Sequence, residues 1–305
     1  MVSRRLRYAK TFAQGESLPD GKRRRTIFDS ALSFELPQVA AFLECCAKSF
    51  QSEKPLAELF DAVSNGNARD LLTYVYQVLT SGHLNTDKIL DKLAAGNYRM
   101  PDFEALRALL FGDSLHYDPS RSPFINLFDI ERADPSEHFS RYIILSFLLS
   151  APEGHPSYGY VPLETILKYC CQLGFSQEHA LATVRFIFDK RCCEPRTPID
   201  EWTDLVDSLK ITAKGKYHIV RLVCLFQYMD AITIDTPILD SAAQLAIRDE
   251  PNINDRLVRC QRFVEYLDGC SRSIQDGGFQ NQWVMTRDAV QKDIQRVRRT
   301  LKQSH

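Results

Sequence analysis

The sequence predicts a mainly α-helical protein: a helical bundle, then a winged helix-turn-helix domain and a C-terminal helical hairpin. Hydrophobic residues make up 44% of the 305 residues, which is enough for a buried core and excludes a wholly disordered chain. Only 13 Gly and 14 Pro residues interrupt the chain. Apolar residues recur at helical spacing along most of its length, which favours helices over a large β-sandwich.

Residues 1–95 predict the small helical bundle. Arg4–Phe12 is expected to form a short helix and Thr26–Phe28 an extended run. Three more helices are expected to begin near Pro37, near Pro55 and at Ala68, because proline is favoured in the first helical turn and the apolar spacing then follows a helix. Short antiparallel helices with apolar faces are the natural contents of such a bundle.

Residues 96–137 are expected to connect this bundle to the next domain, with one helix over 103–111 capped by Asp102. Residues 118–129 are rich in Pro, Ser and Asn, which predicts a segment without regular structure. Four apolar side chains in this segment nevertheless need cover from water: Phe124, Ile125, Leu127 and Phe128. We therefore expect an ordered connector.

Residues 138–236 follow the order of elements typical of a winged helix-turn-helix. The expected elements are the helix 139–149, the strand 159–161, the helices 163–173 and 177–190, the strand 209–212 and one long helix 213–229. Ser176 is expected to cap helix 177–190, which takes the place of the recognition helix, and 194–209 takes the place of the wing. Residues 237–305 predict a helical hairpin that turns at Gly277–Gly278.

The net charge of −1 hides an uneven distribution. Residues 1–25 have eight Lys and Arg against two acidic residues, and residues 256–305 have ten against five. The rest of the chain is therefore strongly acidic. Nucleic acid binding needs a basic surface, since phosphate neutralisation supplies most of the affinity. In this sequence the two ends are the candidates for it, unless their basic residues are simply the solvated sides of loops and helices.

Several classes of site are not predicted. The longest apolar stretch, Tyr142–Leu149, is shorter than a membrane span, and the first residues lack the apolar region of a signal peptide, so we expect a cytoplasmic protein without membrane contact. Six of the nine cysteines stand in adjacent pairs without C-x-x-C spacing, which favours reduced thiols in the core. The seven histidines are scattered, and no metal site is expected.

The segment Gly112–Leu115 matches the Gly-Asp-Ser-Leu signature of one esterase class. The residues before it predict a helix, whereas presenting Ser114 as a nucleophile needs a strand, and no partner base can be identified. A hydrolase is therefore the least favoured hypothesis.

Residues 64–72, Ser-Asn-Gly-Asn-Ala-Arg-Asp-Leu-Leu, resemble the start of the lid helix in AAA+ ATPases of the origin-recognition and STAND types. A winged helix follows the lid in those proteins, as predicted here. The resemblance implies that Arg69 is the "sensor 2" arginine, which contacts the phosphates of a bound nucleotide. Residues 3–8 resemble the end of such an ATPase core, which implies that Arg5 acts on the nucleotide of a neighbouring subunit.

Four later segments also resemble large bacterial P-loop ATPases: Asn126–Phe128, Asp134–Phe139, Ile211–Gly215 and Tyr228–Ala231. The phosphate-binding loop and the acidic Walker B strand of that family are missing from this sequence. We therefore expect a non-catalytic piece of a longer ATPase, or a truncated gene product, that does not hydrolyse ATP by itself. The isolated chain is expected to need no cofactor, and ATP would bind only in a longer parent.

Two functions remain open. In the first, the chain is a regulatory and interaction region whose partners are the ATPase core or other protein subunits; look-alikes of this kind often serve phage defence. In the second, it is a stand-alone DNA-binding winged-helix protein. The candidate DNA contacts are Arg185, Lys190, Lys214 and Lys216. Glu178 and Asp189 on the same predicted helix oppose a phosphate contact there.

Overall fold

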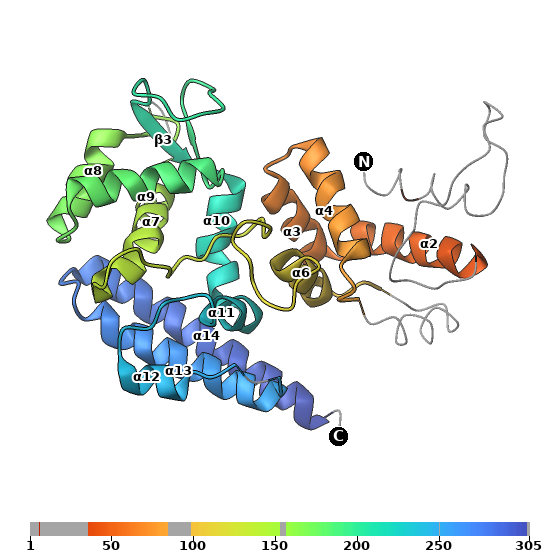
Figure 1. Cartoon of the computed structure of the whole chain (residues 1–305). Coiled ribbons are helices and arrows are strands. Elements are labelled where there is room, and N and C mark those ends of the chain that lie inside the picture. Colours follow the sequence, from red (N-terminus) through yellow and green to blue (C-terminus); the bar gives the residue numbers. More distant parts are fainter. Residues whose placement is uncertain (1–5, 7–35, 85–98, 153–156, 250, 304–305) are drawn as a thin grey trace. The chain divides into compact units, whose positions relative to one another are not determined.

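The computed structural model describes residue 6 and residues 36–84, 99–152, 157–249 and 251–303 (Figure 1). Within these ranges the chain is mainly helical, as predicted, with a small three-stranded sheet. It divides into two compact units: unit 1 contains 1–115 and 120–122, and unit 2 contains 116–119 and 123–305. The predictions of a helix over 4–12 and an extended run over 26–28 lie outside the described residues, apart from the buried, helical Leu6.

Unit 1 is a helical bundle. Its described helices are α2 (Leu36–Ser52), α3 (Lys54–Ser64), α4 (Ala68–Thr80) and α6 (Asp102–Phe111). Pro55 lies in the first turn of α3, and Asn65 ends that helix in the left-handed conformation with φ 47°. The helix α6, which the sequence analysis placed in a connector, packs against both α3 and α4. Its apolar residues Leu106 and Leu109 complete the core of the unit.

The first half of unit 2 contains the small sheet. Its elements are η1 (Pro135–Phe139), α7 (Ser140–Ser150), β1 (Val161–Pro162), α8 (Leu163–Gln172), α9 (Gln177–Asp189), β2 (Cys193–Pro195) and β3 (Ser208–Ile211). The strands are antiparallel in the order β1-β3-β2, and Val161 pairs with Leu209. The expected pairing between 159–161 and 209–212 is therefore present. Ser176 caps α9 as predicted, since its hydroxyl accepts a hydrogen bond from His179 N at 3.1 Å.

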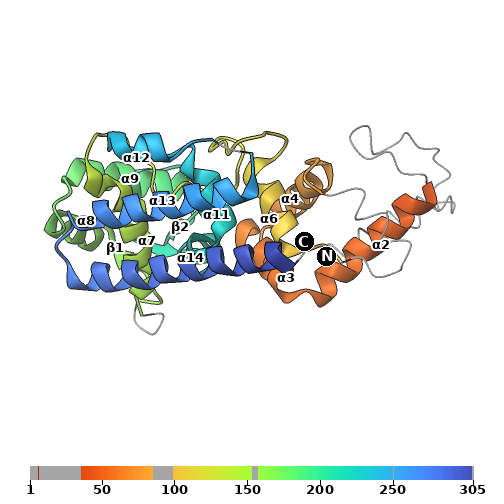
Figure 2. The ribbon, with the colours of Figure 1, turned by 90° about the horizontal axis from the view of Figure 1, so that it is seen from below.

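The second half of unit 2 is helical. Its elements are α10 (Ala213–Val220), η2 (Leu222–Cys224), α11 (Phe226–Thr233), α12 (Ser241–Ala246), α13 (Ile253–Ser271) and α14 (Gly277–Gln303). The long helices α13 and α14 lie side by side (Figure 2). Their shared core contains Phe263, Phe279 and Trp283, which are fully buried or nearly so.

Two predictions for this half were wrong. The single helix expected over 213–229 breaks between α10 and α11, because the buried Leu222 and Val223 turn into the core and Asp293 Oδ2 accepts a hydrogen bond from Phe226 N at 2.9 Å. Gly277 and Gly278 do not form the hairpin turn. They begin α14, whose first turn is capped by the Asp276 carboxylate, which accepts from Phe279 N at 2.7 Å.

Gly215 has a structural role in Ile211–Gly215, one of the segments that resemble P-loop ATPases. A Cβ atom at this position would lie 2.0 Å from the backbone oxygen of Cys192, which no side chain could tolerate. Thr212 caps α10 through its hydroxyl, and its backbone N–H donates to the same Cys192 oxygen at 3.1 Å. The Ile211–Gly215 segment is therefore needed to pack α10 against the end of α9 and the start of β2.

Candidate functional site

Arg69 lies where the resemblance expects a nucleotide-sensing arginine, at the start of α4. The N-cap residue Asn67 holds this turn, because its side-chain oxygen accepts hydrogen bonds from Arg69 N at 2.8 Å and Asp70 N at 3.3 Å. Gly66 precedes it with φ 73°. Arg69 is exposed, and its side chain forms no ion pair within the described part of the chain. The exposed guanidinium can therefore form charge-assisted hydrogen bonds with a phosphate group of another molecule.

The exposed side of α4 continues from Arg69 into a hollow of about 610 Å³. Thr73, Tyr76 and Thr80 follow Arg69 at helical spacing, so they share its face. Tyr76 is 59% exposed, which is unusual for a large aromatic ring in a small bundle. On the other side of the hollow, Arg121 and Asp113 form an ion pair at 2.6 Å. An exposed aromatic ring with polar groups around it is typical of a surface that contacts another molecule.

Arg5, the other arginine implied by the resemblance, lies outside the described residues. Its role therefore stays a prediction.

The surface expected to read DNA has the wrong charge for that task. The exposed face of α9 presents Glu178, Arg185 and Asp189, so one cation stands among two carboxylates. The loop 196–207, which joins β2 to β3, has four exposed acidic residues against the single Arg196: Asp200, Glu201, Asp204 and Asp207. We call residues 196–207 the acidic loop. It would repel a phosphate backbone.

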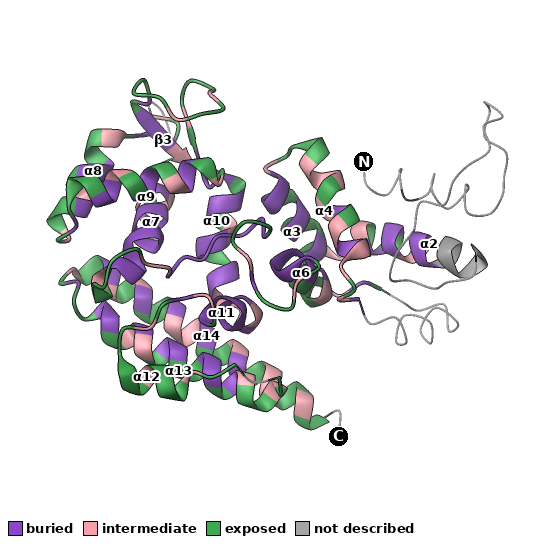
Figure 3. Ribbon diagram, viewed as in Figure 1, coloured by how far each residue is buried: buried purple, intermediate pink, exposed green. Residues whose placement is uncertain are grey.

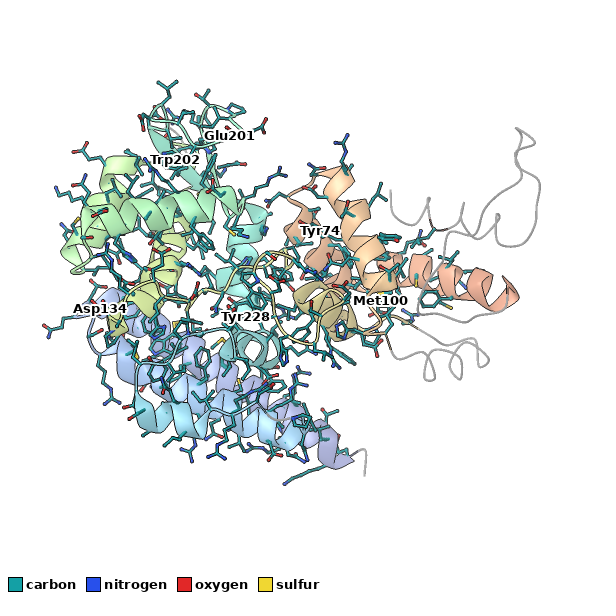
Figure 4. The ribbon with its side chains drawn as sticks, viewed as in Figure 1. Tyr74, Met100, Asp134, Glu201, Trp202 and Tyr228 are labelled. Atoms are coloured by element: carbon teal, nitrogen blue, oxygen red, sulfur yellow. The ribbon has the colours of Figure 1, made fainter. Side chains whose placement is uncertain are left out.

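The acidic loop also exposes apolar surface. Leu205 is 87% exposed, and Figure 4 shows Glu201 and Trp202 on this loop. The Trp202 ring packs edge-on against Phe188 of α9 at 5.5 Å, and the guanidinium of Arg185 lies 5.6 Å from its centre. Trp202 thus fixes the loop to α9. The cation of Arg185 is partly engaged by this ring, which reduces its use as a phosphate contact.

The other three candidate DNA contacts are dispersed. Lys190 Nζ donates a hydrogen bond to the backbone oxygen of Pro119 at 2.9 Å. Lys216 is exposed on α10. Lys214 requires a correction: it is 6% exposed, and its ammonium donates to the backbone oxygen of Lys190 at 2.9 Å. Because this oxygen follows the end of α9, Lys214 acts as a structural tie between α9 and α10 and not as a surface cation.

Three of the four later segments that resemble P-loop ATPases contact one another inside unit 2: Asn126–Phe128, Asp134–Phe139 and Tyr228–Ala231. Residues 123–129 run through the core without regular structure, and Phe124, Ile125, Leu127 and Phe128 are almost completely buried, as predicted. We call residues 123–129 the threaded segment. Its backbone groups have no neighbouring strand to pair with, so they must find side-chain partners.

Tyr228 is one of these partners. Its hydroxyl accepts a hydrogen bond from Leu127 N at 3.0 Å and donates to Ile125 O at 2.8 Å, and Figure 4 shows it inside unit 2. Burial raises the pKa of Tyr228 well above its ordinary value. Arg141, also buried, donates to Asn126 O at 2.7 Å and pairs with Asp129 at 3.0 Å. These polar residues stabilise the core, so their pattern in the sequence reflects structure.

His218 completes the same network. Ile125 N donates to His218 Nε2 at 3.1 Å, so Nε2 is unprotonated and Nδ1 donates to Lys214 O at 2.7 Å. Burial lowers the pKa of His218 to about 3. A proton on Nε2 would face the N–H of Ile125, so this histidine is held neutral and serves the fold.

The segment Gly112–Leu115 is not arranged as a nucleophile site. Gly112–Leu115 follows the helix α6 and not a strand, so Ser114 is not presented at the end of a strand. This arrangement does not assemble a nucleophile with its base. Among the described residues, no group of three or more His, Cys, Asp or Glu side chains is placed to hold a metal ion. No helix in the same residues is long and apolar enough to cross a membrane.

No protein-family model, curated protein or solved structure matches this chain. Its function must therefore be argued from its own surfaces. The acidic loop is the feature that the sequence analysis passed over, although four acidic residues within positions 200–207 were a visible signal. The exposure of Leu205 could not be read from the sequence, because an isolated leucine there is equally consistent with a buried position.

Proposed function

We propose that this chain is a non-catalytic regulatory and interaction region of a bacterial P-loop ATPase. In this proposal, unit 1 is the helical lid that offers Arg69 to a nucleotide held by the ATPase core. The module from α7 to β3 is a winged helix-turn-helix that contacts a protein partner. The observation that supports protein contact most directly is the acidic loop with its exposed Leu205, at the position where a DNA-binding winged helix would offer cations.

The order of elements supports the winged-helix assignment. One helix, a short strand, two helices and two more strands follow each other, and the middle strand of the sheet is β3. The second of the paired helices, α9, lies beside the acidic loop through Trp202. Both elements expose carboxylates, and the loop adds the exposed apolar side chain of Leu205. Such a surface suits a partner with basic and apolar residues.

The exposed side of α4 supports the role of unit 1. Arg69, Thr73 and Tyr76 face outward together, and Asn67 holds the helix start in place. A cation at a capped helix start can respond to the presence of a γ-phosphate only when another protein supplies the nucleotide. The proposal therefore assigns Arg69 a role in the assembled ATPase and none in the isolated chain.

Site-specific photo-crosslinking tests the protein contact. A photoreactive amino acid replaces Leu205 in the chain expressed in its own cells, and the same replacement at Leu115, which is 88% exposed in unit 1, is the matched control. We expect a discrete adduct from position 205 with a P-loop ATPase, identified by mass spectrometry, and a different pattern from position 115. Identical patterns from both positions would contradict the proposal.

Nucleotide turnover tests the role of unit 1. The purified chain alone should show no ATP hydrolysis, and turnover at ordinary enzyme rates would refute the proposal. In the assembled ATPase, Arg69→Ala should lower turnover about tenfold or more without changing the melting temperature. Lys54→Ala, which removes an 87% exposed cation at the start of α3, is the control and should leave turnover unchanged.

A further inference from the structure

A row of cations lies along the outward side of α14. Lys292, Arg296, Arg299 and Lys302 recur at steps of four, three and three residues, and all four are exposed. Figure 3 shows that exposed residues are frequent along the C-terminal part of α14. We call these four residues the basic stripe. The buried residues Val290 and Ile294 lie on the opposite side of the helix, toward the core. The stripe therefore faces away from the protein, as the geometry of an amphipathic helix requires.

Only one of the four cations of the basic stripe has an ion pair among the described residues. Asp293 pairs with Arg296 at 2.7 Å, but its other oxygen caps α11 by accepting from Phe226 N. Among the described residues, Lys292, Arg299 and Lys302 form no ion pair. The three cations without a counter-charge raise the local positive potential.

The dimensions of the stripe fit an extended polyanion. From residue 292 to residue 302 the helix rises about 15 Å, at roughly 1.5 Å per residue. Duplex DNA has one negative charge per roughly 1.7 Å of its axis, so the stripe can lie along several phosphates. Figure 1 shows the acidic loop, beside β3, and the C-terminal end of α14 at opposite ends of unit 2. The loop would therefore not repel DNA bound at the stripe.

We propose that the basic stripe of α14 binds the phosphate backbone of duplex DNA without reading its sequence. This goes beyond the protein contact proposed for the acidic loop and uses a different surface. A row of cations along one helix supplies contacts to phosphates, which position DNA and carry no sequence information directly. Affinity should then depend on salt and not on base sequence.

Fluorescence anisotropy with the full chain and random-sequence duplexes tests the proposal. We expect measurable binding at 50 mM salt, with a slope of log K against log salt of about −3, as three or four phosphate contacts predict. The triple variant Lys292→Glu/Arg299→Glu/Lys302→Glu should bind at least about tenfold more weakly, with a slope near zero. Lys292→Gln/Arg299→Gln should give an intermediate loss, which keeps the test valid if the triple variant is unstable.

Matched variants decide where DNA binds. Lys48→Glu/Lys54→Glu/Lys168→Glu makes the same change of charge at exposed positions elsewhere and should leave most of the binding. An equal loss in this control would overturn the proposal, because binding would then follow net charge alone. A loss confined to a variant of Lys22–Arg25, or to Arg185→Glu/Lys216→Glu, would overturn it as well. So would binding to phosphatidylserine vesicles with none to DNA.

These outcomes are separate from those of the protein-contact proposal. If Leu205 cross-links to an ATPase while the stripe variants bind DNA normally, only the DNA proposal fails. If the stripe variants lose DNA while positions 205 and 115 cross-link alike, only the protein-contact proposal fails.

Discussion

Polar residues have different roles in the core of unit 2 and on its surface. Around the threaded segment they are buried and hydrogen-bonded, and each one satisfies backbone groups or a neighbouring charge. In the acidic loop and the basic stripe they are exposed and largely without partners in the fold. The segments of unit 2 that resemble ATPases therefore build its core, whereas we expect binding at the acidic loop and the basic stripe. Substitutions should separate the two regions.

The largest expected effect is at the buried ion pair between α11 and α13. Asp230, 1% exposed on α11, pairs with Arg259 at 2.6 Å and also with Arg256, and Arg259 is itself 6% exposed. Asp230→Asn removes the buried counter-charge and leaves Arg259 only the more exposed Asp249, at 3.0 Å, so we expect a loss of about 3 kcal/mol in the free energy of unfolding. Urea titration measures it. Arg262→Gln, which removes an exposed ion pair on α13, should cost less than about 0.5 kcal/mol. Equal losses in the two variants would show that burial does not determine the contribution of these ion pairs.

His218 predicts the next largest effect, through pH. Its pKa is about 3 in the folded chain and about 6.5 in the unfolded chain, so its contribution to stability is complete above pH 6.5 and is lost as pH falls toward 3. Between pH 7 and 4.5 the loss should be roughly 2.5 kcal/mol. His218→Asn should flatten this pH dependence in urea titrations, whereas the exposed His116→Asn should not. A wild-type slope in His218→Asn would refute the assignment.

A smaller effect is expected for Tyr228. Removing its hydroxyl by Tyr228→Phe leaves Leu127 N and Ile125 O buried without a side-chain partner, which should cost about 1–3 kcal/mol. Tyr76→Phe, on the exposed side of α4, is the matched control and should be nearly neutral. A loss below about 0.5 kcal/mol for Tyr228→Phe would mean that water replaces the hydroxyl.

The smallest effect on stability belongs to the acidic loop. Asp200→Asn/Glu201→Gln/Asp204→Asn should change the free energy of unfolding by less than about 0.5 kcal/mol, because exposed charges without partners contribute little. The same variant should bind DNA as well as the wild type does, because the acidic loop lies at the other end of unit 2 from the basic stripe. Weaker DNA binding would show that the acidic loop itself contacts DNA.

Local signals in the sequence were enough to predict most of the elements. Ser176 and Pro55 mark helix starts, and the short runs around Val161 and Leu209 pair as expected, because capping and alternation depend on neighbouring residues. The break before Phe226 could not be predicted, since its cap, Asp293, is 67 residues away. The burial of Lys214 was hidden for the same reason, because its acceptor belongs to another helix. For the candidate sites, charge counts located the basic C-terminal region, but only the structure shows which side chains face outward.

The threaded segment also constrains how the chain is made. Phe128 contacts Phe263 and Trp283, which are synthesised more than 130 residues later. On the ribosome, therefore, the middle of unit 2 must stay incomplete until its last long helix has emerged. A shortened chain covering only 138–236 would lack both the threaded segment and the helices that enclose it. We expect such a piece to expose its aromatic interior and aggregate, so that the whole of unit 2 is the smallest part of this region able to fold alone.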